Sequence, residues 1–297
     1  MKLKTIEKII NNKFDAFVKS VTDEKIKDLI KKNTIISGGC IASMLLEEKI
    51  NDYDMYFTNQ ETCFKVAEYF VEMFKKAQSK KKTIPIFVEE FKNRIMIKVK
   101  SSEITSDETK DKDYRYFEAF DPGSPEQERF LNGALSYAKN KQQKQKYKPI
   151  FITSNAITLN GDIQLILRFY GDAKKIHENF DYVHATNYWL SSDRKVHTNP
   201  KALECLLCKE LSYIGSLYPV CSIFRLRKFI KRGFSINAGQ LFKIMFQISD
   251  LDLNNIEVLY EQLIGVDIAY MEELLCRLRS KENIDYIYIC KLIDEIF

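Results

Sequence analysis

Apolar positions recur with a helical period over residues 6–30. The pattern predicts two helices joined by a short turn, because apolar side chains at every third or fourth position form one buried stripe. Thr22 or Asp23 stands between the two runs, and either side chain can cap the second helix. The apolar positions are Ile6, Ile9, Ile10, Phe14, Phe17 and Val21 in the first run, and Ile26, Leu29 and Ile30 in the second.

The next apolar runs predict a strand–turn–helix–strand unit. The first strand covers residues 34–37, Gly38-Gly39 form the turn, a helix covers 40–48, and the second strand covers 52–57. In such a unit the first N–H groups of the helix point at a bound anion, and glycine lets a phosphate approach closely. The unit is therefore a candidate phosphate site.

Further runs predict the remaining elements. Asn160-Gly161 separates two of them and is a strong hairpin signal. From residue 199 onward the pattern is helical. The expected elements before that point are a helix at 61–77 and strands at 84–88, 94–99, 150–159, 163–169 and 180–184.

Between residues 100 and 148 the apolar pattern gives way to Ser, Asp, Lys and Gln. We expect a mobile insertion near 101–148, with a short helix at 128–137 as an alternative. The basic run 139–148 is typical of a solvated segment, although it could also help to hold nucleic acid.

These elements predict an α+β protein of two parts. Residues 1–195 form a mixed head with its helical hairpin, and residues 196–297 form a helical neck and tail. Composition agrees with packed cores, since 45% of residues are hydrophobic and 12% are aromatic.

Charge and cysteine content narrow the function classes. Lys and Arg number 46 against 41 Asp and Glu, a net charge of +5, and the excess is clustered, so local patches matter most. The seven cysteines lack disulfide spacing, and Cys205-x-x-Cys208 has no second pair to complete a zinc site. No apolar run approaches the length of a membrane span, so we expect a cytoplasmic protein with no membrane partner.

Two carboxylates on the predicted strand 52–57 suggest a metal site. Alternate side chains of a strand share a face, so Asp52 and Asp54 point the same way while Tyr53 and Met55 point back. Two like charges so placed repel each other, and a divalent cation such as Mg²⁺ removes that repulsion.

This segment resembles the signature of the DNA polymerase β-like nucleotidyltransferase superfamily. The signature has an apolar residue, a glycine pair, a spacer and Asp-x-Asp, here Ile36, Gly38, Gly39, Asp52 and Asp54. The resemblance implies a polymerase β-like head with a mixed sheet, followed by an all-helical tail. It also implies transfer of a nucleoside monophosphate from a nucleoside triphosphate (NTP) to a hydroxyl, with two Mg²⁺ ions.

Enzymes of that superfamily use a third carboxylate on a neighbouring strand. Asp181 is our candidate, because it lies in the strand-like run 180–183. Glu89, Glu90 and Asp121 remain substitutes.

The resemblance also implies a nucleotide site around the glycine turn. Backbone N–H groups of Gly38 and Gly39 would hold the triphosphate, with a hydroxyl from Ser37 or Ser43. His184 and Asn187 could touch ribose or base, although a structural role for the histidine is the more ordinary interpretation.

A basic stretch at 218–236 is the second informative segment. On a helix Arg225, Lys228 and Arg232 share one face, which suits a triphosphate or a nucleic-acid backbone, or is a plain solvated face. The stretch resembles the neck of CCA-adding enzymes and bacterial poly(A) polymerases, except that Lys228 stands where arginine is usual. Lys209, on the preceding helix, would then reach the triphosphate.

The resemblance favours an RNA 3′ end as acceptor. Nucleotidylation of a protein or small molecule is an alternative, and so is a non-catalytic virion or nucleic-acid-binding protein that keeps the fold. The chain is also similar to nucleotidyltransferase-like proteins of tailed bacteriophages.

Overall fold

The computed structural model describes residues 1–77, 86–91, 94–99, 114–115, 146–152 and 155–255, and the single positions 258–259, 262, 287, 290 and 291. Most of the predicted insertion 101–148 lies outside these residues, as does the alternative helix at 128–137.

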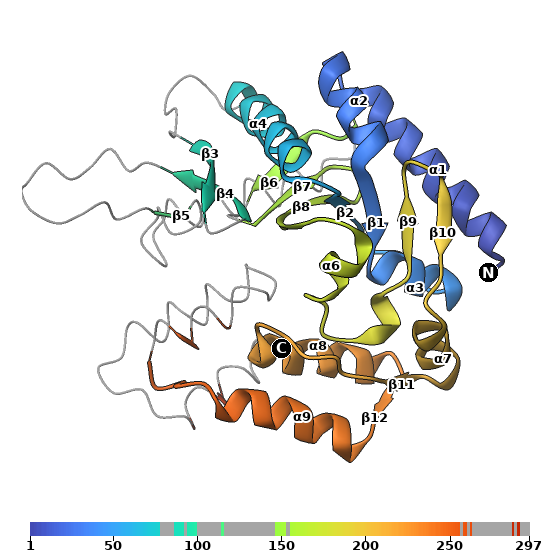
Figure 1. The fold of residues 1–297 in the computed structure, drawn as a ribbon, viewed down its shortest axis with the longest axis vertical. Helices are drawn as coiled ribbons and strands as arrows, with labels where there is room; N and C mark the ends of the chain where they lie inside the picture. The colour runs from blue at the N-terminus through green and yellow to red at the C-terminus, as the bar shows by residue number, and fades with distance from the viewer. Residues whose placement is uncertain are drawn as a thin grey trace, which may run out of the picture. The chain divides into compact units, whose positions relative to one another are not determined.

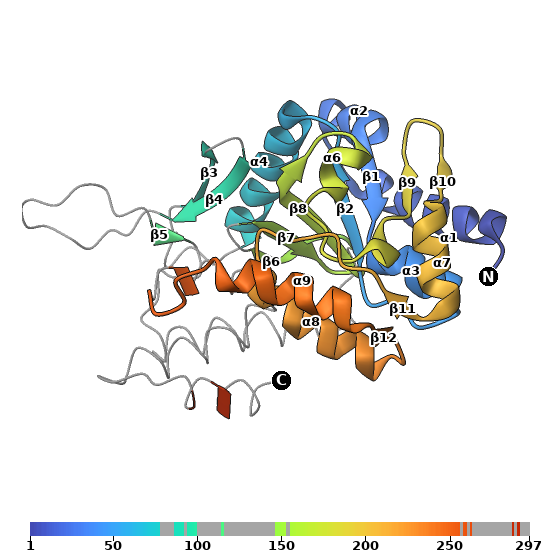
Figure 2. The ribbon, with the colours of Figure 1, turned by 60° about the horizontal axis from the view of Figure 1, so that its bottom comes forward.

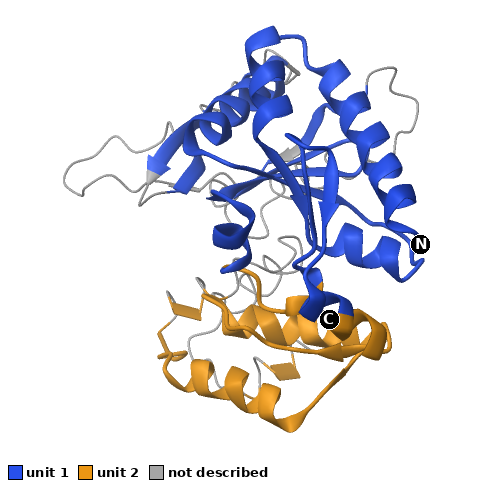
Figure 3. Ribbon diagram, turned by 45° about the vertical axis from the view of Figure 1, so that its right-hand side comes forward, with its two compact units in different colours: residues 1–119, 133–178, 185–203 blue, residues 120–132, 179–184, 204–297 orange. Residues whose placement is uncertain are grey.

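The chain forms two compact units (Figure 3). Unit 1 comprises residues 1–119, 133–178 and 185–203, and unit 2 comprises 120–132, 179–184 and 204–297. The predicted cut after residue 195 falls inside the last segment of unit 1.

Unit 1 is built on a seven-stranded mixed sheet with the order β10-β9-β1-β2-β8-β7-β6 (Figure 1). Strands β2 and β8 run parallel, and every other adjacent pair in this sheet is antiparallel. The α+β class is therefore confirmed. The strands are β1 (Thr34–Ser37), β2 (Tyr53–Phe57), β6 (Pro149–Ile152), β7 (Ala156–Leu159), β8 (Ile163–Tyr170), β9 (Tyr188–Leu190) and β10 (Lys195–His197).

The helices of unit 1 include the predicted N-terminal helical hairpin and the helix predicted after the glycine turn. Asp23 caps α2 by accepting hydrogen bonds from the backbone N–H groups of Lys25 and Ile26, which confirms one of the two expected caps. Helix α1 lies along β10, where Glu7 accepts a hydrogen bond from the backbone of Val196 (Figure 1). The described residues of this unit form the helices α1 (Leu3–Ser20), α2 (Glu24–Asn33), α3 (Gly39–Leu45), α4 (Gln60–Ala77) and α6 (Ala173–His177).

The strand register sorts side chains into one polar and one apolar row. Residues paired across adjacent strands point to the same side of a sheet. One row crosses six strands and is polar throughout: Thr158, Gln164, Asp54, Ser37, Tyr188 and His197. The neighbouring row is apolar throughout: Ile157, Leu165, Met55, Ile36, Trp189 and Val196. The apolar row forms the core, where Trp189 packs on Phe14 of α1 with 4.9 Å between ring centroids.

The strands predicted at 84–88 and 94–99 are present as β3 (Ile86–Phe91) and β4 (Arg94–Val99), and the bounds of β3 are shifted toward the C-terminus. Together with β5 (Tyr114–Arg115) they form a separate antiparallel sheet. The predicted strand 150–159 is divided into β6 and β7. The Asn160-Gly161 turn joins β7 to β8, with positive φ at Gly161 and Asp162.

Unit 2 contains α8 (Pro219–Lys231) and α9 (Ala238–Ser249), which lie side by side (Figure 2). Helix α7 (Pro200–Cys208) precedes them, and a short parallel pair, β11 (Glu210–Leu211) and β12 (Ser235–Ile236), accompanies them. Within the described residues, no helix is long and apolar enough to span a membrane.

The strand predicted at 180–184 is wrong. Asp181 lies in a bend, Tyr182 forms an isolated bridge with Tyr213, and Val183–Ala185 is a 3₁₀ helix. The apolar run is buried by side-chain packing in unit 2 and not by strand pairing, since the Tyr182 ring lies edge-on to the Tyr213 ring with 5.6 Å between centroids.

Candidate active site

The glycine turn lies directly against the second carboxylate of the Asp-x-Asp pair. Gly38 has φ +96°, a conformation that favours glycine, and a Cβ atom there would lie 3.1 Å from Oδ2 of Asp54. The register explains this contact, because Ser37, the residue before Gly38, is paired with Asp54 across β1 and β2. The fold therefore brings together the two halves of the sequence signature.

Asp52 and Asp54 lie near the same buried thiol. Cys40, on α3, has its pKa raised mainly by burial and then by the negative charges of Asp54 and Asp52. Both carboxylates therefore act electrostatically on the same residue of α3. The residue between them, Tyr53, is buried on the opposite side, with Lys13 Nζ 4.9 Å from its ring centre.

This donor set suits a hard divalent cation. Two carboxylates supply oxygen ligands, and Mg²⁺ commonly keeps water or phosphate oxygens as its other ligands. In the described part of the chain, no group of three or more His, Cys, Asp or Glu side chains is arranged to hold a metal. Asp52 and Asp54 are the carboxylates of this site that could hold Mg²⁺, and both their metal role and a third protein ligand stay predictions.

Gly39, the first residue of α3, faces open space. A Cβ atom at this position would have no heavy atom within 4 Å. Ser43, also predicted to donate to the triphosphate, is buried on the same helix. The exposed part of the turn is therefore its backbone at Gly39.

Ser37 is held by the protein itself. Its side chain is fully buried, and its Oγ lies 2.8 Å from Nε2 of His177 and 3.0 Å from the backbone oxygen of Asn187. Asn187 accepts a further hydrogen bond through its side chain from the backbone of Asn199. A phosphate contact by the Ser37 hydroxyl would have to replace one of these bonds, so the structure favours a positioning role over a ligand role.

Sequence reasoning missed two residues beside this turn. His177 belongs to no recognisable sequence motif, and only the folded structure shows that it lies beside Ser37. Gln164 is paired with Asp54 on the parallel strand β8 and is partly exposed. Its neighbourhood depends on strand order, which the apolar pattern of β8 does not encode.

The predicted third carboxylate is engaged in an ion pair within unit 2. Oδ2 of Asp181 lies 2.7 Å from Nη1 of Arg225, and the Asp181 side chain is only 11% exposed. The sequence assigned Asp181 to metal and Arg225 to triphosphate. Either role would compete with this charge-assisted hydrogen bond.

The other unit 2 residues that the sequence predicted to contact the nucleotide lie in different environments. Lys209 donates from Nζ to the carbonyl of Arg232 at 3.2 Å and lies over the ring of Phe234. Lys228 is exposed on α8. His184 is buried against Phe229 and Phe234, and burial lowers its pKa to about 4. The packing supports the structural interpretation of His184.

The alternative candidates for the third carboxylate are not placed beside the glycine turn by strand pairing. Glu89 and Glu90 lie on β3, in the separate sheet. Asp121 lies outside the described residues.

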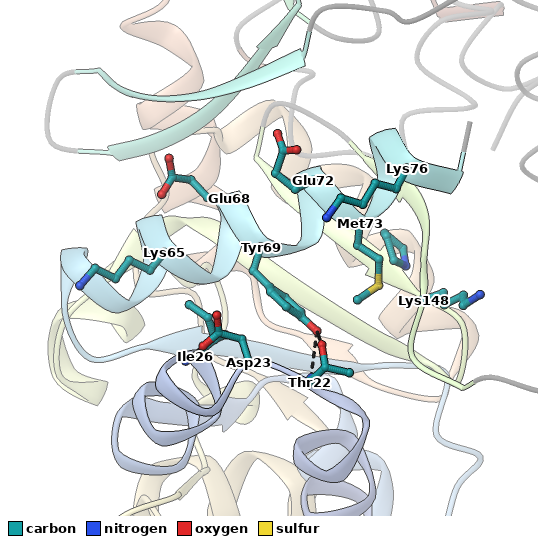
Figure 4. A pocket seen from close by; sticks show the side chains of 11 residues that line it. Thr22, Asp23, Ile26, Lys65, Glu68, Tyr69, Glu72, Met73, Lys76 and Lys148 are labelled. Carbon is teal, nitrogen blue, oxygen red and sulfur yellow. Dashed lines mark hydrogen bonds between the residues drawn. The ribbon is translucent and has the colours of Figure 1, made fainter. Parts of the chain in front are cut away.

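A hollow of about 750 Å³ lies elsewhere in unit 1 (Figure 4). Helix α4 forms one wall with Tyr69 and Met73, and the α1–α2 turn forms another with Thr22, whose backbone N–H donates to the Tyr69 hydroxyl at 3.1 Å. None of the candidate site residues lines this hollow, so its size does not mark the active site.

The fold and the site together define an α+β protein with a glycine turn and paired carboxylates on one mixed sheet. Residues 8–209 match the family described as Gabija anti-defense 2 family protein. The chain belongs to this family. A comparison with curated proteins finds no match.

Similar solved structures include CCA-adding enzymes. The Thermotoga maritima CCA-adding enzyme complexed with tRNA is 12% identical, with a TM-score of 0.44, and the alignment covers 84% of this chain and 46% of that one. CCA-adding enzyme complexes with CTP and with ATP are each 12% identical, with TM-scores of 0.42 and 0.41, and cover 86% of this chain. They are covered over 46% and 47% of their own lengths. The chain thus spans a little under half of these structures.

Proposed function

We propose that the protein is a Mg²⁺-dependent nucleotidyltransferase, which moves a nucleoside monophosphate from an NTP to a hydroxyl group. The observation that carries the proposal is the close approach of Asp54 to the Gly38 turn, with Asp52 near enough to raise the pKa of Cys40 on α3. Neither half of the signature would be informative if the fold separated them.

Asp52 and Asp54 would hold the metal ions in this reaction. When bound, Mg²⁺ activates the attacking hydroxyl and stabilises the leaving pyrophosphate. The chain's own groups orient the reactants. The bare Cα of Gly38 leaves room for the Asp54 carboxylate, and the open backbone at Gly39 lets a phosphate approach.

The structure constrains the acceptor of the nucleotide less than it constrains the candidate metal and nucleotide site. The motif resemblance favours an RNA 3′ end, and the exposed cations Arg227, Lys228 and Lys231 of α8 support an RNA backbone contact. The family description gives a reason to look for the acceptor among the components of a Gabija defence. Protein hydroxyls therefore remain an alternative acceptor.

A second candidate function is protein binding without catalysis. Helix α9 exposes Leu241, Phe242, Met245 and Phe246, each between 39% and 62%. On its other side, Gln247 accepts hydrogen bonds from the Tyr213 hydroxyl and from the Ser216 backbone. Ile244 is the buried apolar residue of this helix, so the four exposed side chains lie outside its packed side. A cluster of large exposed apolar side chains on one side of a helix is typical of a protein interface.

The two functions are separated by a transfer assay with matched variants. Wild type, Asp52→Asn, Asp54→Asn and the double variant are incubated with Mg²⁺, each α-labelled NTP, and RNA or purified Gabija proteins as acceptors. Asp28→Asn is the control, because Asp28 is an exposed carboxylate on α2. We expect label on one acceptor with wild type and the control, and none with either site variant or with EDTA.

The opposite outcome is equally informative. Wild type that inhibits the Gabija defence without transferring label, and double variants that inhibit it equally well, would replace the enzyme proposal with the binding function.

A further inference from the structure

We infer that His177 is a positioning residue of the candidate active site, which acts through Ser37 to hold the backbone that brings Gly38 against Asp54. This inference rests on the proposed nucleotidyltransferase function. Nothing in the sequence signature includes His177, and the residue lies on a short helix far along the chain from the glycine turn.

The hydrogen bonds around Ser37 fix the role of the imidazole. Oγ of Ser37 lies 3.0 Å from the carbonyl oxygen of Asn187, which can only accept. A serine hydroxyl has a single hydrogen, so it donates to Asn187 and must accept from Nε2 of His177, at 2.8 Å. His177 is therefore the donor, with its proton on Nε2.

This arrangement joins three segments at one residue. Ser37 ends β1, His177 ends α6, and Asn187 directly precedes β9. Ser37 is also paired with Asp54 on one side and with Tyr188 on the other. A shift of the Ser37 backbone would thus move the glycine turn relative to Asp54, because Gly38 follows Ser37 directly.

The surroundings of His177 keep the imidazole in place. Its ring lies edge-on to Tyr188, with 5.6 Å between centroids, and Tyr188 is stacked on His197 at 4.8 Å. Burial lowers the pKa of His177 to about 4, so the ring is neutral near pH 7. The half-buried, neutral imidazole can donate to the buried Ser37 hydroxyl without the cost of placing a charge there.

The substitutions His177→Leu and His177→Gln separate positioning from bulk packing. Leucine fills similar space without a donor, whereas the glutamine amide can donate from a position near that of Nε2. Both are compared with wild type and with Lys174→Ala, an exposed change on the same helix. Transfer kinetics and thermal unfolding are measured on the full chain.

We expect His177→Leu to lower kcat by about ten- to a hundredfold, with a smaller change in KM, because the misplacement affects the reacting geometry. His177→Gln should recover most of this loss, and Lys174→Ala should behave as wild type. Ser37→Ala should lower kcat similarly. In the Ser37→Ala background, His177→Leu should add little, since both changes remove the same interaction.

Two results would overturn the inference and are distinguishable. If wild type transfers nucleotide and His177→Leu is equally active, or if its loss adds fully to that of Ser37→Ala, His177 does not act through Ser37. If wild type, Asp52→Asn and Asp54→Asn are all without nucleotide transfer or Mg²⁺–NTP binding, the proposed function itself fails, and the inference fails with it.

Discussion

Gly38 leaves the space that the Asp54 carboxylate fills, since a Cβ atom at residue 38 would lie 3.1 Å from Oδ2 of Asp54. Gly38→Ala should therefore strain the turn as well as crowd the carboxylate, at a cost of about 1–3 kcal/mol in the free energy of unfolding. Transfer activity should be lost. Denaturant unfolding and the labelled-NTP assay measure the two effects.

Gly39→Ala is the matched control, because a Cβ atom there meets nothing within 4 Å. It should leave the free energy of unfolding nearly unchanged. Equal destabilisation by both alanines would contradict the contact between Gly38 and Asp54.

Gln164→Leu should impair transfer without impairing folding. Gln164 is partly exposed beside Asp54, so its amide can contact a bound reactant, and we expect about a tenfold loss of kcat/KM, near 1.4 kcal/mol. Thr158→Val, one strand further along the polar row, is the control. Full activity of Gln164→Leu would remove this residue from the site.

Asp181→Asn tests the third-ligand prediction. An asparagine oxygen can still accept from Arg225 at the place of the 2.7 Å contact, so the loss of stability should be below about 2 kcal/mol. Abolished Mg²⁺-dependent transfer in a folded variant would support a metal ligand. Retained transfer would leave Asp181 with the ion pair alone.

Arg225→Met should destabilise the protein more than Asp181→Asn does, because it leaves a mostly buried carboxylate without its cation. We expect about 1–3 kcal/mol, discounted because the Arg225 side chain is 41% exposed. Urea titration of both variants gives the order, and the reverse order would contradict the ion pair's structural role.

Stability should fall as the pH is lowered from about 6.5 to about 4. The pKa values of His177 and His184 are lowered to about 4 by burial, so the unfolded chain takes up protons first in this range. Each histidine contributes at most about 1.4 kcal/mol per pH unit, and no such loss occurs above the unfolded pKa.

The measurement is the free energy of unfolding of wild type and of His177→Gln/His184→Gln from pH 7.5 to pH 4.5. The variant should show the shallower decline. Parallel curves would show that these histidines are not held neutral by the fold.

Binding of RNA, if it uses α8, should depend on salt through Arg227, Lys228 and Lys231. Replacing all three by alanine should lower the slope of log affinity against log salt by about two to three. The control removes three exposed lysines of α1 and the residue before it, Lys2, Lys4 and Lys8. An unchanged slope for the α8 variant would exclude that helix from the RNA contact.

The local pattern of the sequence determined much of the fold and the position of half of the candidate site residues. The helical period predicted α1 and α2, and the apolar runs with Gly38-Gly39 predicted the β1–α3–β2 unit, because these elements depend on neighbouring residues. The alternation of strand side chains likewise predicted that Asp52 and Asp54 share a side.

Tertiary structure decided which distant residues stand beside that unit. The order of the strands placed Gln164 next to Asp54, and the course of the chain after β8 brought His177 to Ser37. It also replaced the predicted strand around Asp181 by a bend paired to Arg225. The periodicity of apolar residues predicts which face of a helix or strand is buried. These contacts depend instead on which other element packs against that face, and this is determined by the packing of the whole unit.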